Sequence, residues 1–306
     1  MNQVLRIILL AVMLAVLAVL VPSPALVEGW TADPARMSPI PLDAAAGSEP
    51  LESGYLSDSV YEDATIRVQI QEDRYCDTPI YIARVQLADA SQLRTVAAGR
   101  YGSQKVARAE VLADRANAVL TINGDYFTYR TLGLIVRQGR TWRYREDEAV
   151  DTLIVDTNGD LHAVLGLDQQ TLDDAYQAMG GSVEEGGMIL QAFTFGPALV
   201  VDGQRAHEVF VRSDHSEEKK AQRMVIAQDG PLSYVLVCCE GPDEADSQGL
   251  TIEEMAQYML SLGVTTAYNL DGGGSTTMVF HGKTVNATNK LRSISDVICF
   301  CSALAQ

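Results

Sequence analysis

Basic residues are scarce in this chain of 306 residues. It carries 23 lysines and arginines against 40 aspartates and glutamates, which gives a formal net charge of −17. No basic cluster is longer than Lys219-Lys220. A nucleic-acid-binding surface needs clustered cations to neutralise phosphates, so we expect no nucleic-acid partner. An acidic balance instead suits an exported, soluble domain and would attract divalent cations.

Several catalytic and metal-binding patterns are missing. The chain contains no Gly-x-x-x-x-Gly-Lys-Ser/Thr pattern, which excludes a nucleotide phosphate loop, and no Gly-x-Ser-x-Gly elbow supports a serine hydrolase. The four histidines and five cysteines show no metal-ligand spacing. The odd number of cysteines leaves at least one thiol unpaired; we expect buried free cysteines in strands, with a bridge involving Cys76 left open.

Long apolar runs are also rare. The longest uncharged one runs from Ile7 to Val21 and is preceded by Arg6, as in the basic and apolar regions of an export signal. It is short for a membrane span, and prolines flank the small residues that would be cleaved. Residues 1–21 are therefore predicted as a signal peptide or a retained N-terminal membrane anchor. Both alternatives place the remainder outside the cytoplasm.

The remaining chain divides into a spacer and one domain. Six of the ten prolines lie between Pro22 and Pro50, so residues 22–54 are predicted as a Pro/Ala-rich linker. Residues 55–306 alternate short strands with helical patterns at 103–116, 172–179 and 250–262. Paired strands with turn signals predict hairpins at 133–144, 153–165 and 223–238. We therefore expect an α+β domain with mixed or antiparallel sheets flanked by helices.

The most informative motif is the segment from Asn269 to Thr277. Asn269 and Asp271 lie two apart at the end of a predicted strand, so both side chains would share one face. Three glycines then leave a bare backbone that could approach an anion closely, and Ser275 adds a hydroxyl donor. The combination favours a sugar-phosphate site. The alternative is an ordinary tight turn of flexible glycines.

A similar Asn-x-Asp motif occurs earlier in the chain. Asn123-Gly124-Asp125 also follows a predicted helix and strand, as Asn269-Leu270-Asp271 does. One hypothesis is that two pseudo-related halves bring both strand ends to one cleft. Coincidence between two short strings is the alternative.

Two arginines are candidates for binding a phosphate. Arg223 begins a predicted strand and Arg292 lies in a polar segment, and either guanidinium could clamp a phosphate through two hydrogen bonds. A surface ion pair of little energetic value is the alternative for a single arginine.

Several short motifs in order resemble the phosphodiester glycosidase family. They lie between Ala116 and the C-terminus, at residues 122–127, 133–139, 195–203, 223–229, 249–251, 269–276 and 292–295. The resemblance implies hydrolysis of a sugar-1-phosphodiester, of the N-acetylglucosamine-α-1-phosphate type, to free sugar and a phosphomonoester. The substrate would be a sugar phosphate or an envelope or extracellular glycan.

The resemblance also implies roles for individual residues. Asp271 would be the base or nucleophile, Asn123 and Asn269 would orient sugar hydroxyls or water, and Arg223 would contact the phosphate. The other expected substrate or phosphate contacts are Gly272, Gly273, Gly274, Ser275, Thr276, Arg292 and Asp125. No cofactor is required by the motifs, although a divalent cation such as calcium is left open.

Two other functions stay open at this point. One is a non-catalytic module of the same fold that binds envelope polysaccharide. The other is a metal-dependent phosphodiesterase that cuts the phosphorus–oxygen bond and releases sugar-1-phosphate.

Overall fold

The computed structural model describes residues 29–44, 46–181, 188–210, 218–287 and 289–305. The signal peptide or anchor predicted at residues 1–21 lies outside this part of the chain, as does the beginning of the predicted spacer. Among the described residues, no helix has the length and apolar character needed to cross a membrane.

Three β-sheets make up the domain, and every strand pair within the described ranges is antiparallel. The nine-stranded sheet contains, in spatial order, β1 (Tyr55–Ser57), β2 (Val60–Glu62), β3 (Ile66–Tyr75), β4 (Thr78–Leu87), β15 (Ser233–Cys239), β14 (Arg223–Gly230), β16 (Thr266–Asn269), β12 (Ala198–Val201) and β13 (Gln204–Arg205). The β9 sheet contains β10 (Leu161–Val164), β9 (Thr152–Asp156), β11 (Ile189–Phe193), β7 (Gly133–Arg137) and β8 (Arg140–Arg145). The β6 sheet contains β18 (Lys283–Thr284), β17 (Met278–Phe280), β6 (Ala118–Asn123), β19 (Asp296–Cys301) and β5 (Leu93–Ala97).

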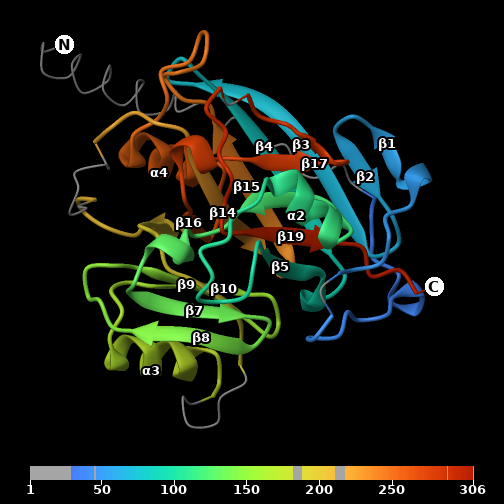
Figure 1. The fold of residues 1–306 in the computed structure, drawn as a ribbon, viewed down its shortest axis with the longest axis horizontal. Helices are drawn as coiled ribbons and strands as arrows, with labels where there is room; N and C mark the ends of the chain where they lie inside the picture. The colour runs from blue at the N-terminus through green and yellow to red at the C-terminus, as the bar shows by residue number, and fades with distance from the viewer. Residues whose placement is uncertain (1–28, 45, 182–187, 211–217, 288, 306) are drawn as a thin grey trace, which may run out of the picture.

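In the part of the chain that the structure describes, three α-helices pack against these sheets (Figure 1). They are α2 (Ala109–Arg115), α3 (Gln169–Ala178) and α4 (Ile252–Ser261). Short 3-10 turns are η1 (Pro34–Arg36), η2 (Glu52–Gly54), η3 (Ala90–Gln92), η4 (Phe127–Tyr129) and η5 (Gly273–Ser275). One apolar core contains residues from all three sheets, and each helix forms a separate apolar cluster with one sheet: α4 with the nine-stranded sheet, α2 with the β6 sheet and α3 with the β9 sheet.

The local sequence signals account for much of this order. All three predicted hairpins are present, as β7–β8, β9–β10 and β14–β15. Helix α4 begins at a capping box, in which Thr251 Oγ1 accepts from Glu254 N and Glu254 Oε2 accepts from Thr251 N. The structure is thus β-rich with few helices, in keeping with the expected α+β class and antiparallel pairing.

The first predicted helix is shorter than expected. The periodicity placed it at 103–116, whereas α2 begins at Ala109. Ala107 instead forms an antiparallel bridge with Ile294, donating to its carbonyl at 3.0 Å. This tertiary contact outweighs the local helical pattern.

The described part of the predicted spacer lies against the domain. Met37 and Ser48 form isolated bridges with Leu304 and Ser302 near the C-terminus. The buried Arg94 of β5 donates to the carbonyls of Pro41 and two neighbouring residues. All five cysteines are free. Cys76 is exposed, and the other four are buried.

Candidate active site

The two Asn-x-Asp motifs meet at one place. Strand β6 ends at Asn123 and strand β16 at Asn269, and the segments that follow are joined by hydrogen bonds. Asn123 Nδ2 donates to the carbonyl of Asp271 at 2.8 Å, and Asp271 N donates to the carbonyl of Gly124 at 3.3 Å. The predicted convergence of the strand ends is therefore present. A relation between two halves stays a hypothesis.

Asp271 carries the best-placed carboxylate of this cluster. Its Oδ1 accepts from Gly272 N at 2.9 Å, and Arg292 Nη2 lies 3.1 Å from Oδ2 and 3.3 Å from Oδ1. The residue is only 6% exposed. Burial raises the pKa of the Asp271 carboxyl, an effect opposed but not cancelled by Ser275, Arg292 and the Gly272 amide. A carboxyl with raised proton affinity beside a cation is suited to acid–base chemistry.

Arg292 links this carboxylate to the glycine turn. Its Nε donates to Ser275 Oγ at 2.7 Å, and its backbone N donates to the carbonyl of Gly274 at 2.9 Å. Its side chain is 46% exposed, so it faces Asp271 on one side and solvent on the other. Arg292 is therefore the arginine available to a phosphate beside Asp271.

Each glycine of the turn is required for a separate structural reason, either close backbone packing or a positive φ. A Cβ on Gly272 would lie 2.7 Å from the carbonyl oxygen of Gln222, and one on Gly274 would lie 2.6 Å from that of Lys290. Gly273 has a φ of 59°, in the left-handed region that favours glycine. The turn is thus packed closely between two other backbone segments.

The turn does not offer the expected row of free amides. Gly272 N donates to Asp271, Gly273 N to the carbonyl of Gln222, and Ser275 N to that of Gly272. Thr276 N likewise donates to the carbonyl of Gly273. These amides already bind protein acceptors, so a phosphate here would depend mainly on the guanidinium of Arg292.

Replacing Gly274 by alanine tests this packing. The added Cβ would displace the Lys290 backbone and with it Arg292, whose amide binds the Gly274 carbonyl. We expect a fall in kcat/KM of about 10- to 100-fold, because a displacement of about 1 Å at a reacting centre has effects of that order. Gly230→Ala is the matched control, since a Cβ there meets only Ser233 at 3.9 Å. Equal activity of both variants would show that the position of Arg292 is unimportant.

The other predicted polar residues contact backbone groups. Arg223 is 7% exposed, and its Nε donates to the carbonyl of Leu250 at 3.0 Å. Asn269 Nδ2 donates to the carbonyl of Gly196 at 2.8 Å, and Asn123 Oδ1 accepts from Thr277 N at 3.1 Å. These contacts hold the three side chains against the backbone, and the substrate roles expected for them stay predictions.

Aromatic side chains beside Arg292 were not singled out from the sequence. Tyr126 has a φ of 63°, unusual for a bulky residue, and its ring centroid lies 5.1 Å from the Arg292 guanidinium. It stacks on Tyr129 with centroids 4.7 Å apart. We call these two rings the aromatic shelf. The sequence signal that could have indicated these rings is Tyr126-Phe127, which directly follows Asn123-Gly124-Asp125.

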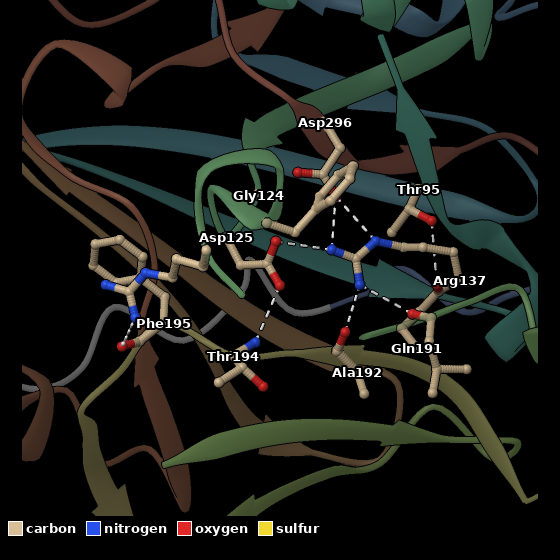
Figure 2. A network of polar contacts seen from close by, with 12 residues as sticks. Thr95, Gly124, Asp125, Arg137, Gln191, Ala192, Thr194, Phe195 and Asp296 are labelled. Carbon is tan, nitrogen blue, oxygen red and sulfur yellow. Dashed lines mark hydrogen bonds and ion pairs between the residues drawn. The ribbon is translucent and has the colours of Figure 1, made fainter. Parts of the chain in front are cut away.

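A fully buried ionic network connects Asp125 to strands β7 and β19 (Figure 2). Arg137 Nη2 lies 3.0 Å from Asp125 Oδ1 and 2.8 Å from Asp296 Oδ2, and Arg137 Nε donates to that same Asp296 oxygen at 3.0 Å. Asp125 Oδ2 accepts from Thr194 N at 3.0 Å, and Arg137 also donates to the carbonyl of Ala192. Asp125 is 0% exposed, and its carboxylate is held by Arg137 and Thr194. The substrate contact expected for Asp125 stays a prediction.

Two carboxylates share one guanidinium in this network. Burial, together with the charge of Asp125, raises the pKa of Asp296 to about 6 even though Arg137 lowers it. Gly124 lies directly against this carboxyl, since a Cβ there would be 2.2 Å from Asp296 Oδ1. Only glycine fits at that position.

The raised pKa predicts an unusual pH dependence of stability. The folded state holds the Asp296 proton more tightly than the unfolded chain, so this group stabilises the fold most below pH 4 and loses that contribution as pH rises to about 6. We expect Asp296→Asn to gain up to about 3 kcal/mol in unfolding free energy relative to the parent over this interval. Urea titrations at several pH values would measure it. A constant difference between the two proteins would contradict the shift.

A cavity is lined in part by the segment from Thr194 to Pro197. Its volume is about 630 Å3, and its lining includes Arg130, Asp151, His207 and the exposed Tyr129. His207 Nε2 and Asp151 Oδ2 are 2.6 Å apart, and this hydrogen bond raises the pKa of His207. Within the ranges that the structure describes, no group of three or more His, Cys, Asp or Glu side chains could hold a metal ion, and the divalent cation stays a prediction.

Comparison with known proteins gives a consistent family assignment. The family model described as phosphodiester glycosidase matches residues 116–301, which include every candidate residue above. No curated protein matches the chain.

Three solved structures share the fold. The catalytic domain of zebrafish N-acetylglucosamine-1-phosphodiester alpha-N-acetylglucosaminidase, auto-inhibited by its pro-peptide, matches with a TM-score of 0.58 and 18% identity over 84% of this chain and 87% of that chain. A hypothetical protein from Synechocystis matches with a TM-score of 0.53 and 15% identity, over 80% and 64% of the two chains. A Burkholderia pseudomallei K96243 protein named "Putative exported protein" matches with a TM-score of 0.52 and 16% identity, over 74% of each chain.

Proposed function

The chain belongs to the phosphodiester glycosidase family, and from this premise we propose that it is an exported hydrolase of sugar-1-phosphodiesters. It would release a free sugar and leave a phosphomonoester. The observation that carries the proposal is the buried Asp271 carboxyl, with a raised pKa, in contact with a half-exposed Arg292. A carboxylate for the anomeric carbon and a cation for the phosphate are thereby adjacent.

The proposed reaction breaks the bond between the anomeric carbon and the bridging oxygen. The phosphomonoester leaves with the electron pair, and water supplies the hydroxyl that the sugar carbon gains. The leaving phosphate needs little protonation, so the main requirements are stabilisation of its charge and activation of water or direct attack by a carboxylate. Arg292 would meet the first requirement and Asp271 the second, as base or as nucleophile.

Supporting residues would hold this pair in position. Asn123 fixes the Asp271 backbone, and Ser275 fixes the Arg292 guanidinium. The aromatic shelf of Tyr126 and Tyr129 lies beside Arg292 and offers an apolar face on which a sugar ring could stack.

The substrate is proposed to carry an N-acetylglucosamine-α-1-phosphate linkage on an envelope or extracellular glycan. The zebrafish enzyme of similar fold is named for that linkage. Export is supported by the basic and apolar N-terminal pattern and by the name of the Burkholderia protein.

Product analysis tests this proposal. The protein is incubated with an N-acetylglucosamine-α-1-phosphodiester, with and without a chelator. Free N-acetylglucosamine and a phosphomonoester are expected. Sugar-1-phosphate and an alcohol would contradict the proposal and favour the phosphodiesterase, most clearly if the chelator stops the reaction.

One observation favours a second function, the non-catalytic glycan-binding module. Four amides of the glycine turn, those of Gly272, Gly273, Ser275 and Thr276, bind protein acceptors, and Arg223 contacts backbone carbonyls. Glycan binding without turnover of any sugar-1-phosphodiester would support that alternative.

A further inference from the structure

A small basic pocket lies beside the aromatic shelf, separate from the cluster of Asp271 and Arg292. Its volume is about 230 Å3, and it is lined by ten residues that include Arg130, Arg143 and Arg145. None of these ten described residues is acidic. Arg143 and Arg145 give the pocket its positive charge, whereas the guanidinium of Arg130 stacks on Phe195, outside this lining. A basic pocket is notable in a chain with a net charge of −17.

The pocket contains buried polar atoms that lack partners. Arg143 Nη1 donates to the carbonyls of Arg130 at 2.6 Å and Phe127 at 3.3 Å. Its Nε and Nη2, and the hydroxyl of Thr128, are buried and have no hydrogen-bond partner among the described residues. Leaving a buried charged donor unsatisfied costs more than a neutral one, so these atoms indicate an acceptor that binds from outside.

Aromatic rings line and back the pocket. Tyr101, Phe127 and Trp142 pack against one another with ring centroids 5.5 to 6.2 Å apart. Such a wall excludes water from one side of the guanidinium groups, which strengthens their attraction to an anion.

The number of donors favours phosphate over carboxylate. Two free nitrogens of Arg143, the Thr128 hydroxyl and the guanidinium of Arg145 exceed what the two oxygens of one carboxylate normally accept. Guanidinium groups bind phosphate through two parallel hydrogen bonds each.

We propose that this pocket binds a second phosphate of the substrate, apart from the one at the bond that is cleaved. The proposal rests on the proposed function, since it assumes a sugar phosphodiester substrate. The two sites are joined by one short segment: the Tyr126 ring centroid lies 5.1 Å from the Arg292 guanidinium, and Phe127 and Thr128, which follow Tyr126 in η4, line the pocket. The natural substrate is then an oligomer or polymer of repeating sugar phosphates, held at two adjacent phosphates.

A binding measurement tests the pocket without turnover. The probe is a short glycerol phosphate oligomer, which has phosphodiesters but no sugar, titrated by calorimetry at about 0.15 M salt. Arg145→Glu changes an exposed side chain of the pocket, and Arg140→Glu changes an exposed one at the other end of β8. We expect Arg145→Glu to weaken binding about tenfold or more, with Arg140→Glu close to the parent.

Arg143→Gln tests the same pocket at a second residue, in the same calorimetric titration. Thermal melting confirms that each variant is folded. Equal affinity of Arg145→Glu, Arg143→Gln and the parent would overturn the proposal. So would equally tight binding of an oligogalacturonate of the same charge, since that ligand carries only carboxylates.

Kinetics separate this proposal from the proposed function. With a substrate of several sugar-phosphate units, we expect Arg145→Glu to raise KM about tenfold and to leave kcat/KM for a single-phosphate diester unchanged. Hydrolysis of both substrates with no effect of Arg145→Glu would refute the second phosphate site alone. Loss of probe binding in Arg145→Glu, with no hydrolysis by the parent, would refute the proposed function and retain the phosphate pocket.

Discussion

Asp271→Asn is expected to lower kcat/KM by about 10³-fold or more while the protein stays folded. The substitution keeps the shape of the side chain and an oxygen for Gly272 N and Arg292, but it removes the basic and nucleophilic oxygen. The raised pKa of Asp271 indicates that burial, not solvent, sets its proton affinity. A carboxyl that served only as a hydrogen-bond acceptor would not need a raised pKa. We therefore expect Asp271 to take part in the chemistry.

The matched control for this experiment is Asp58→Asn, an exposed aspartate far along the chain from the glycine turn. Initial rates and thermal melting of both variants would be compared with the parent. A folded Asp271→Asn protein with unchanged kcat/KM would exclude Asp271 as base or nucleophile. Loss of folding would instead show that Asp271 serves mainly to brace the turn.

Arg137→Met is expected to produce the largest loss of stability, about 3–5 kcal/mol. The guanidinium lies between Asp125 and Asp296, whose side chains are 0% and 1% exposed. Methionine fills part of the space but leaves two buried carboxylates without a cation, and it leaves the carbonyl of Ala192 without this donor. Removing one partner of a buried ion pair costs far more than the pair contributes.

Urea denaturation would measure this loss, with Arg100→Met as an exposed control. The double variant Arg137→Met with Asp296→Asn should recover part of the stability, because one of the two stranded charges is gone. Equal loss in the single and double variants would show that the carboxylates do not depend on Arg137.

Local signals predicted the parts of this protein that depend on nearby residues. The hairpins β7–β8, β9–β10 and β14–β15 followed from turn residues and alternation, and the capping box at Thr251 marked the start of α4. Asn123 was found because it ends a strand and Asp271 because it follows one, each within a recognisable motif, and the structure joins them directly.

Residues whose partners are distant in sequence were not predictable in the same way. Arg137 and Asp296 are 159 residues apart and lie in different sheets, so no spacing rule connects them. The contact between Arg292 and Asp271 depends on how two loops pack, so the sequence alone did not favour Arg292 over Arg223. The glycines of the turn were interpreted as an anion cradle, whereas Gly272 and Gly274 are required by backbone segments that pass within 3 Å of where a Cβ would lie.

The position of oxygen incorporation tests the central claim most directly. The parent protein would hydrolyse an N-acetylglucosamine-α-1-phosphodiester in water enriched in the heavy oxygen isotope, and mass spectrometry would locate the label. The proposed cleavage at the anomeric carbon predicts that the label enters the free sugar and not the phosphomonoester. Label found in a phosphate group would show that water attacked phosphorus, and it would contradict the glycosidase mechanism built around Asp271 and Arg292.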